Sequence, residues 1–146
     1  MAKRVLVPLD QSAVAETVVP LVADIARGSQ ATVRLLQVAR MPEGCVNAEG
    51  RTVVYADQEM SRLEAEGVDY LRTIGMHLEG AGDVEYVVRF GDPVTEIVRE
   101  AEEFDADLIA VTTEGRSAVG RALLGSVAEQ VMRKAAAPVI VMRPGR

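Results

Sequence analysis

Short apolar runs alternate along the chain with segments in which apolar residues recur every three or four positions. The run Arg4–Leu9 is rich in leucine and β-branched residues, which is typical of a strand buried on both faces. Residues 31–39, Val84–Phe90, 107–113 and 138–143 have a similar character and predict four more strands. The spacing between the runs predicts helices.

The first helical segment follows Asp10-Gln11-Ser12, and Gly28 is expected to end it because glycine is common just after helices. Pro20 interrupts the pattern and should kink the helix or delay its start, because proline cannot donate to the carbonyl of Glu16. The apolar positions that give the helical spacing are Val14, Val18, Leu21, Val22 and Ile25.

A loop and a long amphipathic helix are predicted next. Residues 40–57 have a loop-like composition and exceed most connections in length, so they could form a lid or be mobile. The helix begins at Gln58 and ends before Gly80-Ala81-Gly82. Its buried stripe is Met60, Leu63, Gly67, Leu71, Ile74 and Leu78.

The last two helices have recognisable start signals. Asp92 suits the N-cap of one helix and Pro93 its first turn. Ser126 and Glu129 form an S-x-x-E capping box, which predicts a helix over residues 126–135 that begins at Ser126. The inward-facing positions of the first of these helices are Val94, Ile97, Val98 and Ala101.

This alternation predicts one α/β domain over residues 1–146, with a mainly parallel sheet, right-handed crossovers and helices on both faces. The net charge of -6 and the scarcity of aromatic residues argue against a nucleic-acid-binding protein. One cysteine, Cys45, and one histidine, His77, cannot supply a zinc site of the usual kind. No secretory signal or membrane span is apparent, so we expect a soluble, cytoplasmic protein.

Candidate chemistry lies in two loops that follow predicted strands, because ligands of open α/β sheets bind beyond the carboxyl ends of the strands. One loop is Asp10-Gln11-Ser12, and the other spans residues 112–126. Backbone amides at Gly125-Ser126 could seat a phosphate, although the same residues could simply start a helix.

Two other readings of the sequence fail. The segment from Gly115 to Ala122 imitates a P-loop, but Arg121 and Ala122 replace the phosphate-binding lysine and the magnesium-binding hydroxyl. A receiver domain would need clustered acidic residues after the first strand and a lysine after the fifth. The first strand is followed by Asp10 alone, and the fifth ends in Arg143-Pro144.

With these residues assembled, the chain resembles the universal stress protein family over essentially its whole length. The resemblance begins with Val5-Leu6-Val7-Pro8-Leu9-Asp10-x-Ser12. It continues through Gly91-Asp92-Pro93, Gly115-Arg116-Ser117, Leu123-Leu124-Gly125-Ser126-Val127-Ala128-Glu129 and Pro138-Val139-Ile140-Val141. Together these motifs are specific, whereas each alone is weak.

The resemblance implies a five-stranded sheet in the order 3-2-1-4-5 and, in many members, ATP bound through a G-x-x-G-x9-G-[ST] pattern, whose last elements match Gly115 and Gly125-Ser126. It implies that Asp10 meets the ribose or the adenine edge, and that Val38 offers its backbone to adenine. Gly115, Arg116, Gly125, Ser126 and Val127 would surround the phosphates, which a divalent cation could bridge. The full implied set for ATP or another adenine nucleotide also contains Pro8, Ser12, Val111 and Thr112.

Three residues depart from the family pattern. Thr112 stands at its first glycine, Gln11 replaces a glycine often found between Asp and Ser, and Glu114 stands where histidine is frequent. A carboxylate about 4 Å from a phosphate costs about 1–4 kcal/mol, which Arg116, Arg121 or a divalent ion could offset. These departures favour the alternative of a nucleotide-free dimeric stress-response module that acts through protein partners.

Neither hypothesis predicts efficient catalysis. Glu114 is the only acidic candidate for a general base in the second loop, so hydrolysis should be slow at most, and no nucleophile–base pair supports a metabolic hydrolase. In the order 3-2-1-4-5 the fifth strand is an apolar edge without a protecting charge. The resemblance implies that a second copy of the chain covers this edge. It therefore predicts a homodimer joined through Val139, Ile140, Val141 and Met142.

Overall fold

The computed structural model describes residues 3–42, 55–113 and 122–143. The strands are β1 (Arg4–Leu9), β2 (Thr32–Ala39), β3 (Val84–Phe90), β4 (Leu108–Thr112) and β5 (Val139–Met142). The α-helices are α1 (Val19–Ser29), α2 (Tyr55–Gly75), α3 (Pro93–Phe104) and α4 (Ala122–Lys134). Two short 3-10 helices, η1 (Ala15–Val18) and η2 (Met76–Leu78), precede α1 and follow α2.

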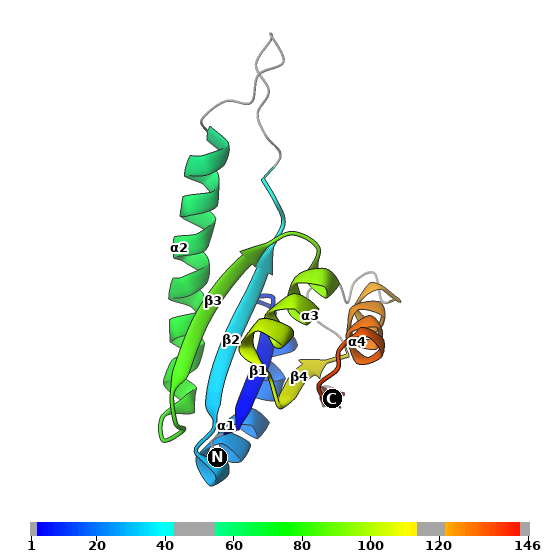
Figure 1. Cartoon of the computed structure of the whole chain (residues 1–146). Helices are drawn as coiled ribbons and strands as arrows, with labels where there is room; N and C mark the ends of the chain where they lie inside the picture. The colour runs from blue at the N-terminus through cyan, green and yellow to red at the C-terminus, as the bar shows by residue number, and fades with distance from the viewer. Residues whose placement is uncertain (1–2, 43–54, 114–121, 144–146) are drawn as a thin grey trace.

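The strands form one parallel sheet in the order β3-β2-β1-β4-β5, which confirms the expected fold. Alternate residues of β1 face opposite cores: Val5, Val7 and Leu9 pack with α1 and α2, whereas Leu6 packs with α3 and α4. Helices therefore cover both faces of the sheet, as Figure 1 shows. This is why β1 consists of apolar residues without alternation.

Pro20 delays the start of α1, which is one of the two outcomes expected from the sequence; the other was a kink. The chain first makes the 3-10 helix η1, and Pro20 then lies in the first turn of α1, where its missing N–H has no partner to lose. The predicted stop at Gly28 is wrong, because α1 continues to Ser29. Gln30 ends it in the left-handed conformation, with φ 54°.

Two other helix starts differ from the sequence prediction. The helix α2 begins at Tyr55, three residues before Gln58. The helix α4 begins at Ala122, so Ser126 is not its N-cap, and Gly125-Ser126 lies inside the helix. The capping-box pattern therefore marks the first turns of α4 rather than its boundary. By contrast, Asp92 caps α3 as predicted, accepting a 3.0 Å hydrogen bond from the Thr95 amide.

An ion-pair network joins α3 to β2 and β3. The buried carboxylate of Glu100 accepts 2.6 Å and 2.7 Å hydrogen bonds from the guanidinium groups of Arg34 and Arg89. Arg89 also binds Glu96, and Arg34 lies over the ring of Phe104, 4.1 Å from its centre. Every charge of this network has an opposite charge beside it, as burial requires.

Candidate functional site

The candidate site lies where the order of strands reverses, between β1 and β4. The two strands pair in register through Val5↔Leu108 and Leu6↔Ile109, whereas β1 continues beside β2 as far as Leu9↔Gln37. The carboxyl-terminal part of β1, with Pro8, therefore extends past the residues that pair with β4. Pro8 has no N–H, and it pairs with Leu36 on the β2 side.

The turn after β1 is fixed by its own side chains. The Oδ1 atom of Asp10 accepts a 3.0 Å hydrogen bond from the Ser12 amide and a 2.6 Å bond from the Ser12 hydroxyl. The Ser12 hydroxyl in turn accepts a 3.0 Å bond from the amide of Ala15, at the start of η1. The carboxylate of Asp10 is thus held at the carboxyl end of β1, where the sequence predicts a ligand-binding group.

Gln11 has a left-handed backbone with φ 67°, which is unusual for a residue with a side chain. Its side-chain amide donates a 3.1 Å hydrogen bond to Oε1 of Gln37, near the end of β2. This bond joins the β1 turn to the neighbouring strand.

The helix α2 contributes a further group to this region. The hydroxyl of Tyr70 donates a 2.6 Å hydrogen bond to Oε2 of Glu16 in η1. Burial raises the pKa of the Tyr70 phenol, and the negative charges of Glu16 and Asp10 raise it further. Tyr70 is therefore a neutral donor that fastens α2 to the segment after the Asp10 turn.

The other described members of the predicted set lie at the carboxyl ends of β2 and β4 or in α4. Val38 is half-buried and pairs with Arg89, and Val111 is buried at the end of β4. Thr112 pairs with Met142, and the half-buried Val127 of α4 packs against the core between the sheet and helices α3 and α4. Because parallel strands end at the same edge of a sheet, Val38, Val111 and Thr112 share the edge that carries Asp10.

The remaining predictions fall outside what the structure describes. Glu114, Gly115 and Arg116 lie outside the described residues, and for Gly125 and Ser126 only the helical backbone is described. Among the residues described, no group of three or more His, Cys, Asp or Glu side chains could hold a metal ion.

Tyr70, Glu16 and Gln37 were not predicted as site residues. Tyr70 contacts a residue 54 positions away, and Gln37 one 26 positions away, so no local spacing in the sequence could have linked them. Tyr70 lies beside the buried stripe of α2, and that position was the only available signal.

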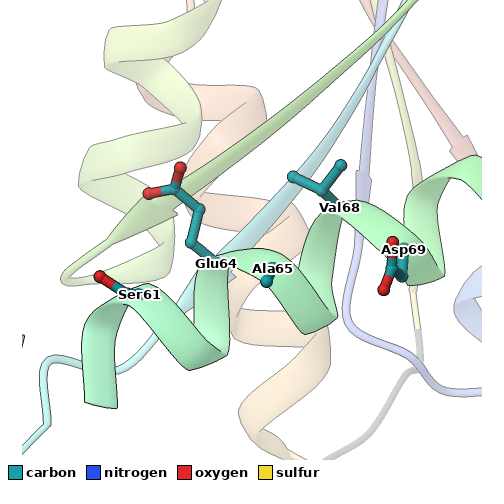
Figure 2. Close-up of a pocket in the computed structure, with 5 residues that line it drawn as sticks. All are labelled: Ser61, Glu64, Ala65, Val68 and Asp69. Carbon is teal, nitrogen blue, oxygen red and sulfur yellow. The ribbon is translucent and has the colours of Figure 1, made fainter. Parts of the chain in front are cut away.

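Two of the grooves formed by the described residues lie away from the Asp10 turn. One, of about 360 Å³, runs along α2, and Figure 2 shows the five described residues that line it, all from that helix. The other, of about 410 Å³, lies between α1 and the α2–η2 segment, and its described lining includes Pro20, Ile74 and His77. The side chain of His77 is exposed.

Comparison with known proteins decides the family. The model of the universal stress protein family matches residues 1–143. The chain belongs to this family. It is 32% identical over 143 residues to the universal stress protein MJ0531 of Methanocaldococcus jannaschii, covering 97% of this chain and 82% of that protein.

Solved structures of relatives agree with the fold. The structure of protein MJ0577 has a TM-score of 0.81 at 28% identity and covers 100% of this chain and 99% of the other. A universal stress protein solved in complex with cAMP has a TM-score of 0.73 at 26% identity, covering 98% of both chains. No helix within the described ranges is long and apolar enough to cross a membrane.

Proposed function

We propose that this universal stress protein binds ATP or a related adenine nucleotide as a regulatory ligand, at the carboxyl ends of β1, β2 and β4. The observation that carries the proposal is the Asp10 turn. Its carboxylate is oriented by two hydrogen bonds from Ser12 beside the reversal of strand order. A fixed carboxylate is suited to accept hydrogen bonds from ribose hydroxyls or a base amine.

The relative solved with cAMP supports the ligand class, since cAMP carries an adenine, a ribose and a phosphate. In this proposal Asp10 meets the ribose or the adenine edge, and the backbone of Val38 meets adenine. The phosphates lie toward the N-terminal end of α4, where the helix dipole favours an anion. The proposed phosphate contacts are Gly115, Arg116, Gly125, Ser126 and Val127, with a divalent cation as a possible bridge; Pro8, Ser12, Val111 and Thr112 complete the site.

Hydrolysis would be slow at most under this proposal. The described titratable groups at the Asp10 turn are the carboxylates of Asp10 and Glu16, which are already bonded to Ser12 and Tyr70, and the Tyr70 phenol, which is held neutral. None of them is suited to activate water near neutral pH. The ligand would therefore act by occupancy, as a signal that other molecules sense.

A second candidate function is a dimeric interaction module that needs no nucleotide. The observation that favours it is β5, an edge strand of four half-buried apolar residues that pairs with β4 on one side. Such an edge can continue into the β5 strand of a second copy. Dimerisation through Val139, Ile140, Val141 and Met142 is compatible with both candidates.

Nucleotide binding by the purified protein and by a variant that lacks one charge distinguishes the two candidate functions. Nucleotide carried through purification gives excess absorbance at 260 nm, and calorimetric titration with magnesium and ATP, ADP or AMP measures affinity. We expect Asp10→Asn to weaken ATP binding at least about tenfold, since it removes a charged acceptor. The matched control is Asp24→Asn in α1, where the Asp24 side chain is 81% exposed. If the unchanged protein shows no binding at millimolar nucleotide, the module without nucleotide is the correct account.

A further inference from the structure

Two glutamine side chains bridge the ends of β1 and β2. The Nε2 atom of Gln11 donates to Oε1 of Gln37 at 3.1 Å, across 26 positions of sequence. Gln11 follows Asp10 and Gln37 precedes Val38, which are the residues that the proposed function assigns to the ribose or adenine edge and to adenine. The bridge therefore joins the two chain segments that would flank the base.

Backbone structure fixes both ends of the bridge. The left-handed φ of 67° at Gln11 belongs to a turn already held by the Asp10–Ser12 bonds. The amide of Gln37 packs against Gly67 of α2, where an added Cβ would lie 3.3 Å from the Gln37 Oε1 atom. The absence of a side chain at Gly67 therefore makes room for the Gln37 amide.

The direction of this hydrogen bond determines what Gln11 presents to a ligand. An amide has one carbonyl acceptor and one NH2 donor group, and the bond to Gln37 uses an N–H of Gln11. The Gln11 carbonyl takes no part in this bond. A carbonyl acceptor suits the exocyclic amine of adenine, from which glutamine accepts a hydrogen bond in its bidentate pairing with that base. Hypoxanthine and guanine carry an oxygen in place of that amine, which would face another acceptor.

We propose that the Gln11–Gln37 bridge is a base-specificity element, which makes this protein prefer adenine to 6-oxopurine nucleotides. This inference rests on the proposed function and names the residues that select its ligand. Asp10 and Val38 would bind the nucleotide, whereas Gln11, oriented by Gln37, would decide which purine is accepted.

The test compares adenine with hypoxanthine, which has nearly the same shape but an oxygen in place of the amine. Calorimetry measures the affinity ratios of AMP to IMP and of ATP to ITP for the unchanged protein, Gln11→Gly and Gln37→Leu. Glycine suits the left-handed backbone at Gln11, so this variant should fold. The matched control is Gln30→Gly, because Gln30 is also left-handed, with φ 54°, and lies at the other end of the molecule, after α1.

We expect the unchanged protein and Gln30→Gly to prefer the adenine nucleotide by roughly tenfold or more, as a site with a matched hydrogen bond does. The ratio should fall toward one in both Gln11→Gly and Gln37→Leu. A merely structural defect would weaken the binding of both nucleotides and leave the ratio of their affinities unchanged. An unchanged ratio in Gln11→Gly, or no preference in the unchanged protein, overturns the inference while the proposed function stands. Failure of every purine nucleotide to bind overturns both.

Discussion

The hydroxyl of Tyr70 lies 2.6 Å from the Glu16 carboxylate and fastens α2 to the segment that follows the Asp10 turn. Through Glu16, η1 and Ser12, this bond connects the long helix α2 with the carboxyl end of β1. The helix α2 therefore stabilises the candidate site, although it supplies none of the predicted ligand contacts.

Replacing Tyr70 by phenylalanine tests this support. A hydrogen bond to a carboxylate contributes about 1.5–3 kcal/mol, and partial exposure should place Tyr70→Phe near the lower figure, measured by urea unfolding at pH 7. Because the pKa of folded Tyr70 is raised, its stabilisation is complete below the unfolded value near 10 and is lost as pH rises above it. The stability difference between the two proteins should narrow above about pH 10. A difference that stays constant through this range contradicts the assignment.

The buried carboxylate of Glu100 should be essential to the fold. Glu100→Ala leaves Arg34 and Arg89 without their shared partner, and breaking a buried pair in this way costs about 3–5 kcal/mol. Denaturant unfolding measures the loss. The control is Glu59→Ala, whose solvent-exposed pair with Arg62 should contribute little to the free energy of unfolding. Equal losses in the two variants would show that the Glu100 network is not stabilising.

Two glycines in helices should respond in opposite directions to alanine. At Gly67 an added Cβ would lie 2.7 Å from Cγ2 of Val88, so Gly67→Ala should destabilise by about 1–2 kcal/mol through overpacking. At Gly28 nothing lies within 4 Å, so Gly28→Ala should stabilise by about 0.5–1 kcal/mol through helix propensity. Thermal unfolding of both variants measures the signs. Stabilisation by both would mean that α2 does not approach β3 as closely as described.

The strands could be predicted from sequence because burial on both faces requires continuous apolar runs. The bounds of β1 and β3 are those predicted, and the sheet order agrees with the family resemblance. Helix ends were less predictable, since several local signals compete there. Gln30 ends α1 although Gly28 is nearby, and α4 begins before the capping-box residue Ser126.

The candidate site was predictable only in part, for a physical reason. Asp10 and Ser12 are neighbours in sequence, so their mutual bonding follows from a local turn. Tyr70–Glu16 and Gln11–Gln37 are contacts between distant segments that meet only when α2 and β2 pack beside β1. A single sequence contains no periodicity that reports such pairs.

The most direct test of the nucleotide site is an amide NMR titration of the isotope-labelled protein with ATP and magnesium. The account predicts saturable shifts at Asp10, Gln11 and Ser12, at Val38 and at Thr112, with the groove between α1 and η2 unaffected. Shifts confined to that groove or to the outer face of α2, or no saturable change at millimolar ATP, would contradict it.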